Sequence, residues 1–327
     1  MFSWPLLCAV VSVASAASVA PSGGAWPLLR GVRPVSGNNG KHILIFGGTG
    51  AQSSIYKFDL ATEKFSFYGS MPPRYYHDGA QLGTKVVLTG GGSRYNAPLL
   101  YNGESFKELN TPFEVVTRMQ NFPQYRSSAV SEDGVYTCGG QKAEAVEIGQ
   151  DRTNECYHYS FENDMWRQIT PMPQPLVCTT SVFHDGQLYI LGGYGNKGFT
   201  ADVWRLDVSS GKWQALKPLP KQRGYGRALL VEVGRSELAV LYCGGHLDKP
   251  KAECWLYDLA RDEWLAASRL ASPRSSLGLV SCGGNVYAFG GWNGDSMASI
   301  EKLGRFSWHT LATTLPVKSH EFGLACY

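Results

Sequence analysis

The chain repeats one short pattern six times, an apolar, β-rich run that ends in a pair of glycines. Successive pairs are about 44 to 53 residues apart, the range found in propellers and other stacked repeats. A unit of this size cannot bury its own apolar face, so neighbouring units must stack against one another. Glycine at these places allows positive φ and the close approach of another backbone segment. The pairs are Gly47-Gly48, Gly91-Gly92, Gly139-Gly140, Gly192-Gly193, Gly244-Gly245 and Gly290-Gly291.

A second set of features divides each unit further. After each pair comes an aromatic residue, followed three positions later by a residue that is usually apolar. In three units an aspartate stands six positions before that aromatic. A proline-containing turn then leads to a new strand that runs to the next glycine pair. Each unit is therefore predicted to form four short strands. The aromatics are Phe65, Phe106, Trp166, Trp213, Trp264 and Trp308.

Together these features resemble the kelch repeat, because the di-glycine, the strand with an aspartate and the spaced tryptophan recur from about residue 42 to residue 327. The resemblance implies an all-β fold, a six-bladed kelch β-propeller with four-stranded blades around a central channel. The composition agrees, since 38 glycines, 12% aromatic residues and only 17% charged residues are typical of short strands joined by tight turns. We expect residues 41–327 to form the propeller.

The two ends of the repeat region predict how the ring closes. The first unit starts directly at a second strand, HILIFGG, whereas the last unit is followed by an additional inner strand, KSHEFGLACY. If the C-terminal strand pairs with the first unit, it completes the first blade and removes an exposed sheet edge. The alternative, an open solenoid, leaves both ends unexplained.

Four cysteines occupy matching positions in two of the units. Cys138 and Cys243 each precede a glycine pair directly, and Cys156 and Cys254 each lie ten residues before the tryptophan of the unit. Directly opposed residues of antiparallel strands are close enough for a disulfide, so we predict Cys138–Cys156 and Cys243–Cys254. In other units the same positions hold apolar residues, which we expect to be cross-strand neighbours. These are Phe46 with Ile55, Leu191 with Val203 and Phe289 with Ala298.

Two other interpretations of the four cysteines stay open, namely buried thiols and a metal site. A zinc site would need four ligands, and the two pairs belong to different blades. Cys282 and Cys326 fall late in inner strands of blades that meet at the closure. A disulfide between them would lock the ring, unless those strands lie too far apart. Cys178 is expected to be a buried thiol.

The first 16 residues are typical of a cleaved signal peptide. An apolar core is followed by Ala14-Ser15-Ala16, a small-x-small cleavage site, although no Lys or Arg precedes the core. The core is too short to span a bilayer, and no other segment is apolar enough to cross one. Residues 17–40, rich in Ser, Gly, Pro and Ala, are expected to form a linker. Disulfides persist in oxidising compartments, so both features predict a secreted, extracellular product.

The ligand site is expected on the face where the loops between second and third strands meet the loops that lead into the inner strands. Basic and aromatic residues gather there, a combination typical of binding surfaces. They suit a carboxylate, a sulfated or sialylated sugar, or an acidic peptide. The alternative is that each arginine only ties neighbouring blades together, as in the ordinary kelch pattern. The candidates are Arg74, Tyr75, Tyr76, Tyr125, Arg126, Arg223, Tyr225, Arg227, Arg274 and His320.

Several other functions fit the sequence less well. A net charge of +3 is small for a dedicated nucleic-acid binder. Galactose oxidase, a copper enzyme on this fold, uses two Tyr and two His, and no complete set is evident. Sialic-acid epimerases use an arginine and an acid, and Asp78 is the only acid we find near the loops that lead into the inner strands. Glu147-x3-Asp151-x3-Glu155 faintly resembles the iron site of plant specifier proteins, with Glu in place of His or Cys.

We therefore expect a monomeric, secreted, non-catalytic protein without a cofactor or metal, which binds a protein or glycan, acidic in character, through the loop face of the propeller. One alternative is a carbohydrate-active enzyme, for which an arginine within reach of an acid in a closed pocket would be the sign. The other is an intracellular adaptor propeller, for which a fully reduced, cytosolic product would be the sign.

Overall fold

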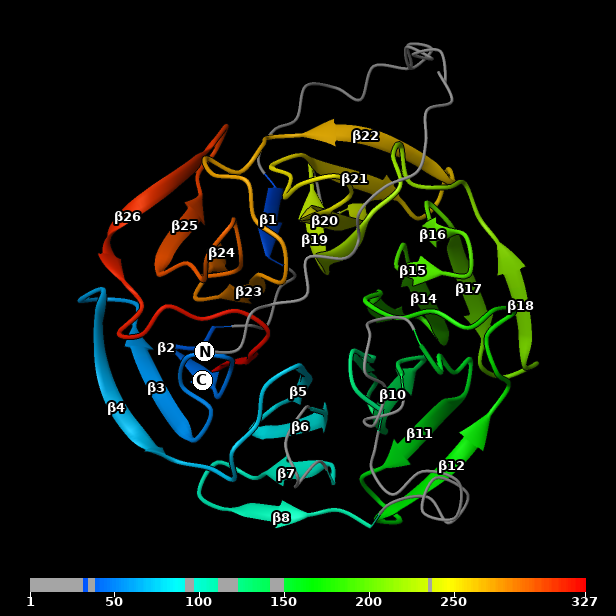
Figure 1. Cartoon of the computed structure of the whole chain (residues 1–327), viewed down its shortest axis with the longest axis horizontal. Helices are drawn as coiled ribbons and strands as arrows, with labels where there is room; N and C mark the ends of the chain where they lie inside the picture. The colour runs from blue at the N-terminus through cyan, green and yellow to red at the C-terminus, as the bar shows by residue number, and fades with distance from the viewer. Residues whose placement is uncertain (1–31, 35–38, 92–96, 111–122, 142–149, 235–236) are drawn as a thin grey trace.

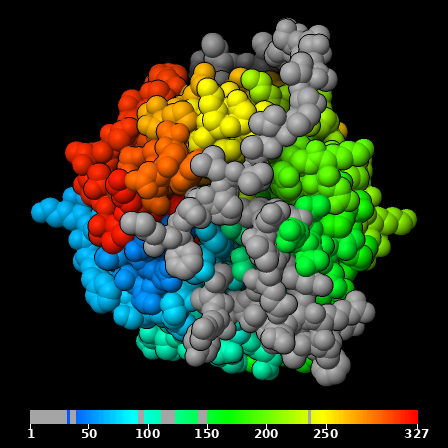
Figure 2. Space-filling view, in the orientation of Figure 1, coloured from blue at the N-terminus to red at the C-terminus, as the bar shows by residue number. Residues whose placement is uncertain are grey.

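The chain folds into six antiparallel sheets around a central axis, each with four main strands (Figure 1). The structure is a computed structural model and describes residues 32–34, 39–91, 97–110, 123–141, 150–234 and 237–327. Within these ranges every regular element is a strand. The blades follow one another around the ring in chain order, as the space-filling view also shows (Figure 2). The predicted all-β, six-bladed propeller is confirmed.

Each blade runs from an inner strand beside the channel to an outer strand at the rim. From inner to outer, the first blade is β27 (Gly323–Cys326), β2 (His42–Phe46), β3 (Ser54–Asp59) and β4 (Lys64–Ser70). The second is β5 (His77–Leu82), β6 (Lys85–Gly90), β7 (Leu99–Tyr101) and β8 (Phe106–Glu108). The third is β9 (Ser127–Val130), β10 (Gly134–Cys138), β11 (Cys156–Ser160) and β12 (Met165–Ile169).

The other three blades have the same order. The fourth is β13 (Thr180–His184), β14 (Gln187–Leu191), β17 (Val203–Asp207) and β18 (Lys212–Ala215), with a small hairpin, β15 (Tyr194–Gly195) and β16 (Gly198–Phe199), in its second-to-third strand loop. The fifth is β19 (Gly224–Val233), β20 (Glu237–His246), β21 (Cys254–Asp258) and β22 (Glu263–Ala267). The sixth is β23 (Gly278–Cys282), β24 (Asn285–Phe289), β25 (Ser299–Leu303) and β26 (Trp308–Thr314).

The C-terminal strand closes the ring. β27 pairs antiparallel with β2, so the first blade contains the last strand of the chain. Ile43 opposes Cys326, and Phe46 opposes Gly323. One residue beyond the strand, the amides of His42 and Tyr327 each donate to the carbonyl of the other, at 2.6 and 2.7 Å. The closure that the two ends of the repeat region predict is therefore the observed one.

The repeated glycines hold neighbouring blades together. In all six blades the first glycine of the pair has positive φ, and a Cβ there would lie 2.4 to 2.7 Å from a carbonyl oxygen in the loop that leads into the next blade. For Gly192 that oxygen belongs to Arg223, and the amide of Gly193 donates to it at 2.7 Å. Only glycine leaves room for this contact. In the second blade the pair in this position is Gly90-Gly91 and not Gly91-Gly92, because three consecutive glycines end that run.

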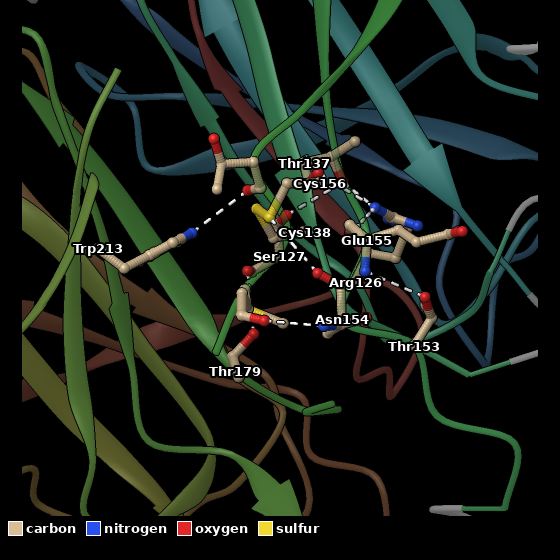
Figure 3. The surroundings of a disulfide bond; sticks show 12 residues. Arg126, Ser127, Thr137, Cys138, Thr153, Asn154, Glu155, Cys156, Thr179 and Trp213 are labelled. Atoms are coloured by element: carbon tan, nitrogen blue, oxygen red, sulfur yellow. Dashed lines mark hydrogen bonds between the residues drawn. A yellow bond between two sulfur atoms is a disulfide. The ribbon is translucent and has the colours of Figure 1, made fainter. Parts of the chain in front are cut away.

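Both predicted disulfides within blades are present. Cys138 of β10 opposes Cys156 of β11, and their Cα atoms are 4.1 Å apart (Figure 3). Cys243 of β20 opposes Cys254 of β21 at the same Cα separation. In each case the bond joins the second strand to the third. The apolar pairs Phe46 with Ile55 and Leu191 with Val203 oppose each other at the corresponding places.

The expected apolar pair of the sixth blade is wrong, because Phe289 opposes Ile300 and not Ala298. The cause is the position of the tryptophan in the hairpin of the third and fourth strands. In the sixth blade Trp308 belongs to the last opposed pair before the turn, with Leu303, whereas in the fifth blade Trp264 opposes Tyr257 and one further pair, Asp258 with Glu263, lies before the turn. Counting back from the tryptophan therefore overshoots by two residues.

A third disulfide, Cys282–Cys326, connects the inner strands of the sixth and first blades. Their Cα atoms are 5.4 Å apart, so the strands lie close enough at this level for the bond that the sequence left open. The bond lies at the ring closure, next to the paired β2 and β27. Cys178 lies outside the three disulfides as a buried thiol, as predicted.

One strand falls within the segment that its composition marks as a linker. β1 (Val32–Pro34) pairs antiparallel with β19 and adds a fifth strand to the fifth blade. Val32 opposes Val233 and packs against the apolar core beneath it. β19 and β20 have ten residues each, about twice the length of most other described strands, and the far end of β19 is the part that β1 pairs with.

The core lies between the facing sheets of successive blades, and tryptophans tie the blades together at the rim. Trp264 donates from Nε1 to the carbonyl of Lys217 at 2.9 Å, and Trp308 donates to that of Ser268 at 3.1 Å. In the three units that have it, the repeated aspartate caps the turn before the aromatic residue; Asp258, for example, accepts from two backbone amides of that turn at 2.9 and 3.1 Å. In the described part of the chain we find no helix that could span a membrane.

Candidate functional site

The loops between second and third strands share one face of the ring with the residues that lead into the inner strands, and we call this the loop face. In the fourth blade, Val177 and Tyr194 exchange two backbone hydrogen bonds, at 3.1 and 2.8 Å. Ser275 and Trp292 do the same in the sixth blade, at 3.0 and 2.8 Å. In these two blades the loop is thus anchored to the residues that lead into the inner strand of its own blade, which is the arrangement expected from the sequence.

Six residues, one from each blade, form what we call the mouth ring at the top of the channel. Each precedes its inner strand or lies at its start, and each has φ between 51° and 59° although none is glycine. From the second member onward, the amide of each donates to the carbonyl of the preceding member, in five hydrogen bonds of 2.8 to 3.5 Å. Since the backbone alone builds this ring, its side chains are available for other contacts. The members are Tyr76, Tyr125, Cys178, Tyr225, Ser276 and Glu321.

Three of the predicted ligand-binding arginines, Arg74, Arg223 and Arg274, do not lie on the surface of the loop face. All three are fully buried two residues before the mouth ring. Arg74 donates to the carbonyl of Gly90 at 2.8 Å, Arg223 pairs with Glu253 at 3.2 Å, and Arg274 pairs with Glu301 at 2.5 Å. Burial lowers the pKa of Arg74 to about 10. Each contact lies within the arginine's own blade, so these side chains stabilise single blades rather than tie neighbouring blades together, and the main reason to expect an acidic ligand is removed.

Arg126 lies at the mouth but is also engaged within its blade. Its Nε donates to the Thr137 hydroxyl at 3.1 Å, and its Nη2 donates to the carbonyls of Thr137 and Glu155 at 3.1 and 2.9 Å (Figure 3). The guanidinium carbon lies 5.4 Å from the centre of the Tyr157 ring. Arg126 therefore fixes the start of the third blade and presents little charge to a ligand.

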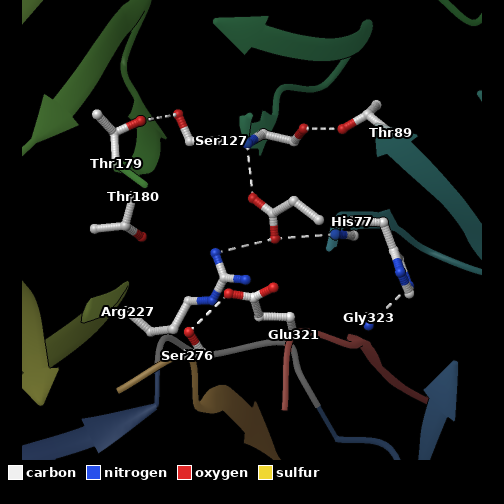
Figure 4. Close-up of polar contacts among 12 residues, drawn as sticks. His77, Thr89, Ser127, Thr179, Thr180, Arg227, Ser276, Glu321 and Gly323 are labelled. Atoms are coloured by element: carbon white, nitrogen blue, oxygen red, sulfur yellow. Dashed lines mark hydrogen bonds and ion pairs between the residues drawn. The ribbon is translucent and has the colours of Figure 1, made fainter. Parts of the chain in front are cut away.

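Arg227 spans the channel just below the mouth ring. Its Nη1 lies 3.4 Å from Oδ1 of Asp78, and the two residues come from the fifth and second blades, which are opposite in the ring. Asp78 also accepts from the amide of Ser128 at 2.8 Å (Figure 4), and Arg227 Nε donates to the carbonyl of Leu277 at 3.2 Å. One ion pair thus links four blades across the channel.

Partly exposed rings form a continuous series on the loop face, which we call the aromatic belt. Tyr76 and Tyr125 stack with centroids 4.8 Å apart, and Tyr125 meets Tyr225 edge to face at 6.2 Å. Phe199 of the small hairpin continues the series at 6.4 Å from Tyr225. The belt consists of Tyr75, Tyr76, Tyr125, Tyr225, Phe199, His246 and Trp292, with the buried ring of His320 beside Tyr76.

Four tyrosines of the belt and His320 were predicted, whereas Phe199, His246 and Trp292 were missed. The missed residues lie in second-to-third strand loops, which the sequence places on this face without indicating which side chains point to the mouth. An aromatic residue directly after the glycine pair is the signal that would have found His246 and Trp292.

A small cavity of about 30 Å³ lies within the mouth ring, with room for one or a few water molecules. Glu321 lines it and is only 5% exposed, and burial raises the pKa of its carboxyl to about 7. The expectation that Asp78 is the only acid near these loops is therefore wrong. Glu321 was missed because it holds in SHEFG the place of Tyr76 in RYYHD, a match visible only when these loops are aligned.

The two histidines near the mouth are neutral at physiological pH. His77 accepts at Nε2 from the amide of Gly323 at 3.1 Å, and burial together with the charge of Arg74 lowers its pKa to about 3 (Figure 4). Burial also lowers the pKa of His320 to about 4, and its Nδ1 lies 2.9 Å from the Thr49 hydroxyl. Neither histidine adds positive charge to the loop face.

No three His, Cys, Asp or Glu side chains gather as metal ligands among the residues that the structure describes. Of the faint iron-site resemblance, Glu147 lies outside the described residues, and Cys156 is in a disulfide. The Tyr157-His158 pair lies on β11, in the interior of the third blade, where His158 Nε2 is 3.4 Å from Asp133.

Comparison with known proteins gives a consistent picture. The KLHDC2/KLHL20/DRC7 Kelch-repeats domain matches residues 112–291. Beta-scruin of Limulus polyphemus is 23% identical over 292 residues, which cover 80% of this chain and 30% of that protein. Alpha-scruin of the same organism is 24% identical over 271 residues, 76% of this chain and 28% of that protein. Kelch-like protein 35 of Mus musculus is 30% identical over 156 residues, 46% of this chain and 25% of that protein. The chain thus spans less than a third of the length of these relatives.

Proposed function

Because the chain belongs to the kelch-repeat family, whose propellers typically bind proteins, we propose that it is a secreted, non-catalytic binding protein. It recognises a protein or glycan ligand through the loop face. The observation that carries this function is the aromatic belt, a series of partly exposed rings on a rigid support around the mouth.

The belt has the properties of a binding surface. Tyrosine and tryptophan provide a large amphipathic contact area and lose little conformational entropy when a ligand orders them. Their backbone is fixed before binding, since the mouth ring and the bridges between loops and inner strands are closed by backbone hydrogen bonds. A rigid aromatic surface of this kind is where residues that dominate binding energy are usually found.

Secretion is supported by the disulfides together with the leader-like N-terminus. Six of the eight cysteines pair in the structure, and Cys8 lies in the predicted signal peptide. Bonds of this kind are rare in reducing compartments. An intracellular adaptor would have to keep all six thiols reduced although each pair is held at bonding distance.

An enzyme on this propeller is the second candidate, because the mouth contains an arginine within reach of an acid, which is part of what such an enzyme would need. Arg227 pairs with Asp78, and Arg227 and Glu321 both line the mouth cavity. The volume of this cavity, about 30 Å³, argues against this function, since pockets that enclose small molecules measure about 300 to 1,000 Å³. A sugar acid would have to displace the tyrosines of the mouth ring before it reached either acid.

The test is ligand capture by the full chain, secreted from animal cells with its own leader. The wild type, a belt variant with Tyr125→Ala and Tyr225→Ala, and a control with Phe67→Ala are screened against an extracellular protein library and a glycan array. Phe67 is 62% exposed on β4, at the outer rim, so its loss removes a similar ring away from the mouth. We expect the belt variant to lose the ligand that the wild type and the control retain. Equal capture by all three, or an intracellular product with reduced cysteines, contradicts the proposal.

A further inference from the structure

Glu321 is a buried acid of the mouth with one hydrogen-bonding position that is not used. Its Oε1 accepts from the hydroxyl of Ser276 at 2.8 Å, whereas its Oε2 is buried and has no hydrogen-bond partner (Figure 4). A buried carboxylate oxygen without a donor costs stability, and protonating it removes the charge but leaves the new O–H without an acceptor. The side chain is therefore poised to accept a hydrogen bond from outside the chain.

The other charges around the mouth are already engaged. Arg227 pairs with Asp78 and donates to a backbone carbonyl, and Arg126 donates to two carbonyls and a hydroxyl. His77 is neutral, because burial lowers its pKa to about 3. Glu321 is thus the charged group at the mouth with an open position, and that position calls for a donor.

The walls of the cavity favour a cation as that donor. Tyr76, Tyr125 and Tyr225 lie around the cavity, and the faces of aromatic rings attract cations. After burial itself, the charge of Glu321 is among the causes that raise the pKa of the Tyr125 and Tyr225 hydroxyls, which places both rings within its electrostatic reach. Aromatic rings around one carboxylate are a recurrent way to bind an ammonium group.

We propose that the mouth ring is a subsite for a primary ammonium group of the ligand, which donates to Glu321 Oε2 between the tyrosine rings. The subsite rests on the proposed function, because it adds the chemistry of one anchoring group to binding at the loop face. The ammonium comes from a lysine side chain or from the N-terminus of a protein. Tyr76 and Tyr225 are both partly exposed, so the group enters from the open side of the mouth.

The size of the cavity selects ammonium over guanidinium. A volume of about 30 Å³ accepts a group as small as water, and an ammonium is a compact point charge of that size. A planar guanidinium with three nitrogens is larger and needs its donors satisfied in a fixed fork. A carboxylate would meet the charge of Glu321. The ligand class is thus opposite in charge to the acidic ligand that the sequence suggests.

The experiment titrates the full chain with four small probes by isothermal calorimetry at pH 8. Nα-acetyl-lysine amide and alanyl-alanine amide present the ammonium of a side chain and of an N-terminus. Nα-acetyl-norleucine amide lacks the charge, and Nα-acetyl-arginine amide replaces the ammonium by a guanidinium. We expect one or both ammonium probes to saturate the protein at least about tenfold more tightly than the norleucine and arginine probes.

Two variants locate the site. Glu321→Gln keeps the size of the side chain and an acceptor for Ser276 but loses the charge, and it lowers the affinity for the ammonium probe at least about tenfold. Asp295→Asn makes the same chemical change at an exposed acid of the loop face that pairs with Lys318, and it leaves the affinity within about twofold. Absence of saturable binding by both ammonium probes, or equal binding by Glu321→Gln and the wild type, overturns the subsite.

A pH series on the wild type gives a readout that does not depend on how well a variant folds. Because the pKa of Glu321 is about 7, its ionised fraction and the affinity for Nα-acetyl-lysine amide, whose amine stays protonated, rise about tenfold from pH 6 to pH 8. The facing groups keep their charge over this range, since the pKa of Arg126 is about 10, that of Tyr76 about 12 and that of His77 about 3. Arg227 stays paired with Asp78, and a Cys178→Ser background removes the thiol of the ring. A flat pH series overturns the subsite.

The two proposals fail separately. If the ammonium probes do not bind but the belt variant still loses a captured ligand, the subsite is wrong and the binding function stands. If the probes bind but capture is the same for the belt variant and the wild type, the binding function at the loop face is wrong.

Discussion

Replacing Glu321 by glutamine should stabilise the protein, and only above a certain pH. The folded structure buries this carboxyl at the mouth of the channel and raises its pKa from the ordinary value of 4.5 to about 7, mainly through desolvation. The folded state therefore holds the proton more tightly than the unfolded chain does. The resulting stability is fully present below about pH 4.5 and is lost as the pH rises through 7.

The size of the effect follows from the two pKa values. One pKa unit corresponds to about 1.36 kcal/mol, so ionising Glu321 in the folded state lowers the free energy of unfolding by about 3 kcal/mol at pH 8 and above. Glutamine mimics the neutral acid at every pH and still accepts a hydrogen bond from Ser276. We expect Glu321→Gln to unfold with the same free energy as the wild type at pH 4 and to be about 3 kcal/mol more stable at pH 8.5.

Urea denaturation of both proteins without reductant, at pH 4, 6, 7 and 8.5, measures this difference. The other titratable groups at the mouth are the same in both proteins, so their contributions cancel in the comparison. These groups are Asp78, Arg227, Arg126, His77, Cys178 and the ring tyrosines. A difference in unfolding free energy that does not change with pH, or one that favours the wild type at pH 8.5, refutes the reasoning.

Three further predictions concern the disulfides, the ion pair across the channel, and the N-terminus and free thiol of the secreted protein. The Cys282→Ala and Cys326→Ala double variant loses about 4 kcal/mol of unfolding free energy, because that bond closes a loop of 44 residues. The Cys243→Ala and Cys254→Ala double variant loses about 3 kcal/mol, because that bond closes a loop of only 11 residues. If urea denaturation gives the reverse order, the prediction is wrong. Arg227→Met leaves Asp78 without its partner across the channel and lowers the free energy of unfolding by about 3 to 5 kcal/mol. Adding Asp78→Asn restores much of this loss. If the single variant unfolds within about 1 kcal/mol of the wild type, the prediction is wrong. Mass spectrometry of the secreted protein finds an N-terminus at Ala17 and one thiol that can be alkylated after denaturation, Cys178; an intact leader or additional thiols would contradict the extracellular assignment.

The architecture could be predicted because each feature that builds it needs a particular residue at a particular place. The first glycine of each pair lies so close to a carbonyl oxygen of the loop into the next blade that a Cβ would not fit. Every unit therefore requires glycine at this position. The cysteines were paired by counting from glycines and tryptophans, and the count succeeds wherever the aromatic residue holds the same place in the outer hairpin. It fails for Phe289 because Trp308 lies one residue pair closer to the turn than Trp264 does.

The site was predicted less well because the direction of a side chain depends on the backbone around it. Arg223 and Arg227 lie two residues before and two residues after Tyr225, and both look like candidates in the sequence. The left-handed conformation of Tyr225 turns the chain between them, so that Arg223 is buried in its blade and Arg227 spans the channel. Neither composition nor spacing shows which of the two arginines is buried in its blade and which spans the channel, because this depends on the sign of φ at Tyr225.

The same conformation explains why the mouth is the place where this propeller can acquire specificity. Besides Glu321, five residues of the mouth ring adopt positive φ although none of them is glycine. Each does so at a cost of about 1 kcal/mol that glycine would avoid. The ring itself needs only backbone amides and carbonyls, so glycine at all six positions would close it equally well. The side chains are therefore not explained by the fold. Three tyrosines, a thiol, a hydroxyl and a carboxylate converge on one small cavity, and the contact that they leave unmade, at Glu321 Oε2, is one that a ligand can supply.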